Sequence, residues 1–143
     1  MKKFNFTGAP VIVVSFLVIA GALTAFDMNM SEKKLESVSP VEFAKNVVSD
    51  EGFVLVDVRT PEEYDLGHLP SAINVDYQSF DFESVISELE REGKYAIYCR
   101  SGKRSAEALL MMEEMGFKWV IDLSGGMESL VDNSEATEYF SQD

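Results

Sequence analysis

The segment that most constrains the fold is a short apolar run from Tyr95 to Tyr98, which ends at the only cysteine of the chain, Cys99. A basic loop that contains a glycine, Arg100 to Ser105, follows at once, and a helical pattern starts directly after it. In this order of strand, tight loop and helix, backbone N–H groups and a helix N-terminus converge on the Cys99 thiol. Such a position binds anions and favours a thiolate over a thiol, so we expect a nucleophilic sulfur here.

The rest of the chain alternates between strand and helix patterns. Continuous apolar runs at 53–56 and 119–121 are typical of strands covered on both faces, and 72–75 is expected to be a briefer strand. Helical patterns cover 40–48, 61–66, 82–89 and the segment from the loop to Gly116. This alternation predicts an α/β fold with a central, mainly parallel sheet flanked by helices on both faces. Ligands of such sheets bind beyond the carboxyl ends of strands, where Cys99 lies.

Two helix starts carry recognisable caps. Ser39 precedes a proline and is expected to cap the helix that follows it. Asp81 is expected to cap the helix at 82–89, whose buried face would consist of Phe82, Val85, Ile86 and Leu89.

The charge balance narrows the class of partner. The formal net charge of the 143-residue chain is −13, and a surface this acidic repels nucleic acid and anionic lipid headgroups. We therefore expect no nucleic-acid partner. Against this background Arg100, Lys103 and Arg104 form a local island of positive charge beside the thiol. An island of this kind at a helix N-terminus predicts a small anionic substrate.

The first 27 residues predict export. Lys2 and Lys3 precede an uncharged stretch, 4–26, and the small residues 20–22 after its apolar part fit a signal-peptide cleavage site. The same stretch approaches the roughly 20 residues that span a bilayer. Residues 1–27 are thus expected to be a signal peptide or an N-terminal membrane anchor, with 4–26 as the anchoring segment. Either interpretation places the remainder on the periplasmic or extracellular side.

Three further boundaries complete the expected organisation. Residues 28–37 are polar and lack apolar periodicity, so we expect a linker there. Residues 38–131 hold the strand and helix patterns and are expected to form the one folded domain. Residues 132–143 are expected to be an acidic C-terminal tail.

Three blocks of sequence resemble the rhodanese family. The segments Val56–Tyr64 and Gly67–Val75 together resemble the opening signature of rhodanese domains. Tyr98–Ala106 resembles their active-site loop, and Leu123–Met127 resembles the paired-glycine turn near their end. The blocks occur in the family's order, and the resemblance covers roughly Val38 to Leu130. The chain is therefore similar to an exported, single-domain rhodanese.

This resemblance implies a thiosulfate sulfurtransferase. Cys99 would attack the outer sulfur of a donor such as thiosulfate and hold it as a persulfide. It would then pass the sulfur to a thiophilic acceptor, either cyanide or a thiol. The resemblance implies no metal and no organic cofactor, and it identifies no protein partner.

The loop after Cys99 is expected to bind the substrate. The candidate residues are Arg100, Ser101, Gly102, Lys103, Arg104 and Ser105. Backbone amides of this loop are expected to surround the thiolate and the donor's oxyanion, and Gly102 permits backbone geometry that a side chain would obstruct. We rank Arg104 first as the clamp on the donor, because a guanidinium binds an oxyanion through two parallel hydrogen bonds.

Three residues outside the loop are expected to support the site rather than react. Asp57 and Arg59 would tie the sheet end to neighbouring loops by hydrogen bonds and an ion pair, with Glu63 as a further partner. His68 is the only histidine and therefore the obvious acid or base. It lies on a turn that the family uses structurally, however, and persulfide chemistry needs no base once the thiol is ionised. We therefore expect His68 to act in structure.

Two departures from the family pattern lie outside the loop. Ser71 stands where glycine is usual, in a turn. Leu130 stands where tryptophan is frequent, and we expect it to alter a wall of the pocket.

Two other classes of function remain open. Phosphatases and arsenate reductases of related folds have loops that resemble cysteine, five residues, then arginine. Here four residues separate Cys99 from Arg104, so the loop is one residue short for a tetrahedral oxyanion. The second alternative is a non-catalytic or sulfur-relay module that acts through a protein partner. The retained cysteine and basic loop favour turnover over this alternative.

Overall fold

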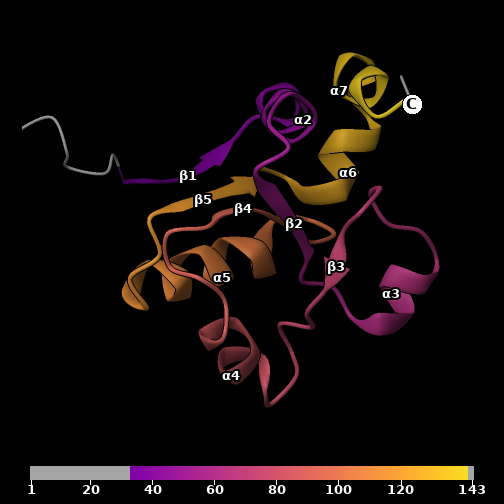
Figure 1. The fold of residues 1–143 in the computed structure, drawn as a ribbon. Coiled ribbons are helices and arrows are strands. Elements are labelled where there is room, and N and C mark those ends of the chain that lie inside the picture. Colours follow the sequence, from indigo (N-terminus) through magenta and orange to yellow (C-terminus); the bar gives the residue numbers. More distant parts are fainter. Residues whose placement is uncertain (1–32, 142–143) are drawn as a thin grey trace, which may run out of the picture. The chain divides into compact units, whose positions relative to one another are not determined.

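A five-stranded sheet forms the centre of the computed structural model, which describes residues 33–141 (Figure 1). The strands are β1 Lys34–Val38, β2 Phe53–Asp57, β3 Ile73–Asn74, β4 Lys94–Tyr98 and β5 Trp119–Leu123. Their order across the sheet is β1-β5-β4-β2-β3, and every neighbouring pair is parallel. The predicted α/β class with a parallel sheet is therefore confirmed.

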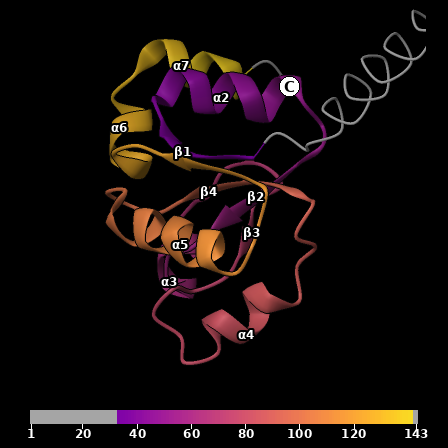
Figure 2. The ribbon, with the colours of Figure 1, turned by 90° about the vertical axis from the view of Figure 1, so that its left-hand side faces the viewer.

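Helices cover both faces of the sheet, as expected. They are α2 Pro40–Ser49, α3 Pro61–Asp65, α4 Phe82–Ser87, α5 Lys103–Glu114, α6 Gly126–Val131 and α7 Ser134–Tyr139. Figure 2 shows α2, α6 and α7 on one side of the sheet, with α4 and α5 on the other. The core is accordingly split into two layers, because alternate residues of each strand point to opposite faces.

The two core layers use neighbouring residues of the same strands. Ile97 of β4 packs with Met112 of α5 in one layer, while Ala96 packs with Phe43 of α2 in the other. Burying a large apolar side chain of this kind contributes about 1.5–3 kcal/mol to folding. Leu130, expected to alter a wall of the pocket, is 2% exposed and packs in the layer around Phe43.

The helix starts match the sequence signals in part. Ser39 caps α2, because its hydroxyl accepts a hydrogen bond from the Glu42 amide at 3.3 Å. Asp81 precedes α4 as expected, but its side chain makes no capping bond. The backbone of Asp81, with φ −101° and ψ 3°, lies outside the extended region that a capping residue adopts, and its carboxylate accepts a hydrogen bond from the Ser79 hydroxyl instead. Val85, expected on the buried face of this helix, is exposed.

Residues 34–37, expected in the linker, form most of strand β1. This strand pairs with β5 residue by residue, from Lys34 opposite Trp119 to Val38 opposite Leu123. Backbone hydrogen bonds make the ladder, so an edge strand needs few apolar side chains, and charged residues protect its free edge. A strand of this polar composition was therefore not recognised from the sequence.

Part of the expected acidic tail, 132–143, is also folded. Asn133 caps α7 by accepting a hydrogen bond from the Ala136 amide at 3.0 Å. Ala136 is fully buried, and Tyr139 and Phe140 pack against the same core layer. The acidic side chains of Glu135 and Glu138 lie on the exposed side of this helix.

The signal peptide or anchor expected at 1–27 lies outside the described residues and stays a prediction. Within residues 33–141, no helix is both long and apolar enough to cross a membrane.

Candidate active site

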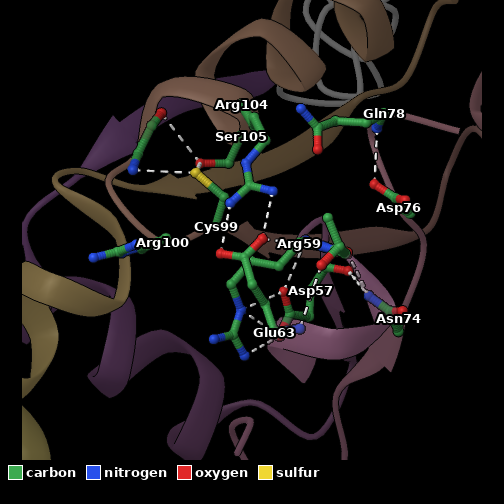
Figure 3. Close-up of polar contacts among 12 residues, drawn as sticks. Asp57, Arg59, Glu63, Asn74, Asp76, Gln78, Cys99, Arg100, Arg104 and Ser105 are labelled. Atoms are coloured by element: carbon green, nitrogen blue, oxygen red, sulfur yellow. Dashed lines mark hydrogen bonds and ion pairs between the residues drawn. The ribbon is translucent and has the colours of Figure 1, made fainter. Parts of the chain in front are cut away.

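Cys99 lies directly after β4, a strand with a neighbour on each side, and begins the loop that leads into α5. The residue is only 1% exposed. Within the described part of the chain, two donors reach its sulfur: the Gly102 amide at 3.1 Å and the Ser105 hydroxyl at 3.5 Å (Figure 3). Hydrogen bonds donated to sulfur stabilise a thiolate more than a thiol. The structure thus gives the thiol a local environment suited to a nucleophile.

Gly102 gives the loop its shape. Its φ of +84° is in the left-handed region, and it stands immediately before α5. A Cβ atom added to Gly102 would lie 2.8 Å from the backbone nitrogen of Gly125. Any other residue would therefore be strained and would push the loop away from the turn before α6.

That turn holds the loop from its other side. The amides of Met127 and Glu128 donate hydrogen bonds to the carbonyls of Cys99 and Arg100, at 2.9 and 3.0 Å. A Cβ on Gly126 would lie 2.5 Å from the same two carbonyl oxygens, so only glycine allows this approach. The loop and the start of α6 are consequently one hydrogen-bonded unit.

Arg104 lies beside the thiol and is already paired. Its Nη1 and Nη2 donate to the two carboxylate oxygens of Glu63, at 2.7 and 2.9 Å, from 41 residues away in sequence. Figure 3 shows the guanidinium close to both Cys99 and the Glu63 carboxylate. The bond from Arg104 holds the pKa of Glu63 below its usual value. The same bond raises the pKa of Arg104, and the nearby Cys99 adds a smaller effect in the same direction.

Glu63 has a partner that the sequence analysis did not name. It was expected as a further partner of Asp57 and Arg59, and its charge does attract that of Arg59, but its side-chain hydrogen bonds go to Arg104 and to the Thr60 amide. The bond to Thr60 completes a capping box at the start of α3, which the sequence pattern could have suggested. The bond to Arg104 depends on the tertiary fold.

Asp57 and Arg59 form a buried pair at the end of β2. The Asp57 carboxylate accepts bonds from Arg59 Nε at 2.9 Å and Nη2 at 2.6 Å. Arg59 Nη2 also donates to the Gly67 carbonyl at 2.7 Å, and its bonds to Asp57 raise the pKa of the guanidinium. Asn74, which the sequence analysis did not single out, donates to the carbonyls of both residues. These bonds tie the sheet end to the following loop.

His68 is exposed and makes its contacts with Tyr64. The two rings stack with centroids 3.7 Å apart, and His68 Nδ1 lies 3.0 Å from the Tyr64 carbonyl oxygen. The Tyr64 hydroxyl donates to the Ala72 carbonyl at 2.7 Å. Ser71, which lies between His68 and Ala72 in the sequence, has a φ of +62°. Glycine adopts this left-handed conformation without steric cost, which explains why glycine is usual at this position in the family.

The comparison with known families decides the identity of the domain. The model described as Rhodanese-like domain matches residues 39–133. This chain belongs to the rhodanese family. Its fold is shared with a rhodanese-related protein from Thermoplasma volcanium, with a TM-score of 0.61, 27% identity, and coverage of 69% of this chain and 93% of that one.

Curated relatives of this rhodanese differ in function. A thiosulfate:glutathione sulfurtransferase of Saccharomyces cerevisiae is 33% identical over 121 residues, 72% of this chain and 87% of the yeast protein. A tRNA uridine(34) hydroxylase of Pelagibacter ubique is 28% identical over 138 residues, 96% of this chain and 44% of that protein. The chain spans about half the length of two curated relatives that it matches, the hydroxylase among them.

The remaining loop residues of this rhodanese face solvent. Ser101 and Lys103 are exposed, while Arg100 pairs with Glu128 at 2.9 Å across the protein surface. An open cavity of about 280 Å³ lies beside the loop and is lined by Arg59, Glu63, Leu66, Gly67 and Arg100. The loop thus has buried residues at the sulfur and exposed ones on the surface, of which Arg100 lines this cavity.

Proposed function

We propose that this rhodanese is a sulfurtransferase that moves a sulfane sulfur from a small anionic donor, such as thiosulfate, to a thiophilic acceptor through a persulfide on Cys99. The observation that carries the proposal is the placement of the sulfur, which accepts hydrogen bonds from Gly102 and Ser105 with the Arg104 guanidinium beside it. The name of the yeast relative supports thiosulfate as the donor class.

The first half-reaction forms the persulfide. The Cys99 thiolate attacks the outer sulfur of thiosulfate, the sulfur–sulfur bond of the donor breaks, and sulfite leaves with its electron pair. The Gly102 amide holds the attacking sulfur in place at 3.1 Å. The negative charge moves from the thiolate to the leaving sulfite, so a cation beside the sulfur stabilises the transition state.

The second half-reaction restores the thiolate. Cyanide attacks the outer sulfur of the persulfide, the bond to Cys99 Sγ breaks, and the electron pair returns to Sγ as thiocyanate leaves. A thiolate acceptor reacts in the same way and leaves as its own persulfide. Donors that stabilise the resting thiolate, Gly102 and Ser105, therefore also favour the leaving group of this step.

Arg104 can bind a donor oxyanion without leaving Glu63. A guanidinium carries five N–H groups, and the pair with Glu63 uses one on each terminal nitrogen. Three N–H groups therefore remain for the donor. Glu63 holds the guanidinium plane beside Cys99, which lowers the entropy lost when the donor binds.

An intact-mass spectrum of the full-length protein after incubation with thiosulfate tests the proposal. We expect a gain of one sulfur atom that cyanide removes and that Cys99→Ser does not show. No gain on a thiol shown to be free and reduced would contradict the proposal. Circular dichroism of Cys99→Ser serves as the control, since the variant should keep the fold.

The Pelagibacter relative, whose alignment covers 96% of this chain, supports a second candidate, a role in tRNA modification of the kind named for that protein. The formal net charge of −13 counts against this candidate, because nucleic acid is bound largely through its phosphates. Binding of unmodified tRNA at low salt would favour it, and the persulfide gain above would not depend on the result.

A further inference from the structure

Asp122 is a buried carboxyl group to which the reaction above gives no role. It lies in β5 beside Ile97 of β4, and it is 1% exposed. Its Oδ2 accepts a hydrogen bond from the Ser37 hydroxyl of β1 at 2.6 Å. Its Oδ1 has no hydrogen-bond partner among the described residues. A carboxylate with an unpaired oxygen in the core is unfavourable, so the site favours a proton on Asp122.

Ser105 stands between this carboxyl group and the reactive sulfur. It is fully buried in the first turn of α5. Its Oγ lies 3.5 Å from Cys99 Sγ and 3.3 Å from the Gly102 carbonyl oxygen. Asp122 follows Val120 by two residues in β5, and the Val120 side chain packs in the core layer that holds Cys99 and α5, so alternation along the strand points the Asp122 carboxyl group into the same layer as Ser105. In that layer the Ser105 hydroxyl lowers the pKa of the Asp122 carboxyl group, against the effect of burial. A serine hydroxyl has one proton, so it can donate to only one of these neighbours at a time.

The groups that face Asp122 are few. Burial raises the pKa of its carboxyl group, and the hydroxyls of Ser105 on α5 and Ser37 on β1 oppose that effect. From β4 it faces the apolar Ile97. No ionised side chain of residues 33–141 contributes to the shift. The ionisable group reached through Ser105 is Cys99, and the Arg104 guanidinium lies beside that sulfur.

We propose that Asp122 is a positioning residue for Cys99 and acts through Ser105. The neutral carboxyl group donates to Ser105 Oγ, and Ser105 is then oriented to donate its own proton to Cys99 Sγ. The ionised carboxylate takes the Ser105 proton as an acceptor and withdraws that donor from the sulfur. This inference rests on the proposed role of Cys99 as the nucleophile, but it is independent of the group that Cys99 transfers.

The coupling predicts a distinctive pH dependence. Ionisation of the Asp122 carboxyl group removes one of the donors that stabilise a negative charge on Cys99 Sγ. This loss works against the rise in reactivity with pH that any thiol shows, so the rise extends over a wider pH range. An amide in place of the carboxyl group keeps a donor at Ser105 at every pH and removes the opposing effect.

The rate of Cys99 alkylation by iodoacetamide, measured against pH on the reduced full-length protein, tests this. Asp122→Asn is expected to narrow the pH range over which the rate rises, and to raise the rate about tenfold where the wild-type carboxyl group is ionised. Ser105→Ala is expected to slow alkylation and to abolish the effect of Asp122→Asn in the double variant. Asp132→Asn, the same change at an exposed position, should match the wild type.

Two results would overturn the inference. If Asp122→Asn left the pH profile of Cys99 alkylation unchanged, Asp122 would have no influence on Cys99. If Asp122→Asn had the same effect in the Ser105→Ala variant as in the wild type, Asp122 would act on Cys99 through its charge and not through Ser105. If Asp122→Asn does not fold, ¹³C spectra of the Asp122 carboxyl group replace it. Cys99→Ala should then shift the titration of that group to lower pH, and an unshifted titration would contradict the coupling. Neither measurement uses a sulfur donor, so the inference and the proposed sulfur transfer fail separately.

Discussion

Two ion pairs lie near the carboxyl ends of the strands, and they differ in burial and in reach. Asp57 and Arg59 are two residues apart, and their side chains are 0% and 9% exposed. Glu63 and Arg104 are 41 residues apart, and theirs are 27% and 20% exposed. The buried pair has its remaining bonds to the backbone, whereas the half-buried pair borders the thiol. An ion pair between a carboxylate and a guanidinium therefore stabilises the fold at Asp57 and Arg59, whereas at Glu63 and Arg104 it leaves the guanidinium accessible to a substrate.

Breaking the buried pair should have the largest effect on stability. Arg59→Ala leaves the Asp57 carboxylate buried without its partner, which costs about 3–5 kcal/mol. Urea denaturation measures the free energy of unfolding. Arg100→Ala is the matched control, because its pair with Glu128 is exposed and is expected to contribute less than about 1 kcal/mol. Similar losses in both variants would contradict the distinction.

Breaking the half-buried pair should act on activity instead. Arg104→Ala is expected to lower kcat/KM for thiosulfate by about 10²–10³-fold, because it removes the cation beside the sulfur. The free energy of unfolding should change by about 1 kcal/mol or less. Steady-state kinetics and denaturation are measured together, with Lys45→Ala as the control for loss of one positive charge. A large stability loss with little kinetic effect would make this pair structural too.

The contribution of the Glu63–Arg104 pair to the free energy of unfolding should also depend on pH. Because Arg104 lowers the pKa of Glu63 in the folded state, the contribution of the pair is complete above the unfolded value of about 4.3. It disappears as the pH falls through the lowered folded value. The stability difference between wild type and Glu63→Gln, up to about 1 kcal/mol at pH 7, should therefore vanish in acid. A difference independent of pH would show that the charge of Glu63 is irrelevant.

The smallest effect is expected in the loop that Arg59 holds. Ser71 adopts a left-handed conformation that costs a residue with a side chain about 1 kcal/mol. Ser71→Gly should stabilise the protein by about that amount or less, measured as the midpoint of thermal unfolding. Ser71→Ala should not stabilise it. A loss of stability in Ser71→Gly would mean that the serine side chain makes a favourable contact there.

The sequence predicted the parts of this molecule that depend on local pattern. The apolar run before Cys99 and the glycine after it were sufficient to place the strand, the loop and the helix. The partner of Arg104 was not predictable, because Glu63 reaches it through the packing of α3 near the start of α5. Asp122 was overlooked because the run 119–121 before it reads as a buried strand, and strand periodicity does not show what a polar residue faces.

Errors at the domain boundaries have a common cause. Strand β1 is mostly polar, and helix α7 is polar or acidic apart from Ala136 and Tyr139, so neither has the apolar periodicity that identifies an element. Both are defined by long-range pairing, β1 with β5 and α7 with α2. A boundary drawn from apolar pattern alone therefore falls inside the folded domain at each end.

The interlock between the reactive loop and the paired-glycine turn limits how this site can be engineered. Residues 99–105 present two carbonyls that are satisfied by amides at positions 127 and 128, and the approach needs glycine at 126. The loop alone is therefore not sufficient to recreate this site in another protein. Transplanting it to another parallel-sheet scaffold would require the distant segment 125–128 to be moved with it, in the same relative position.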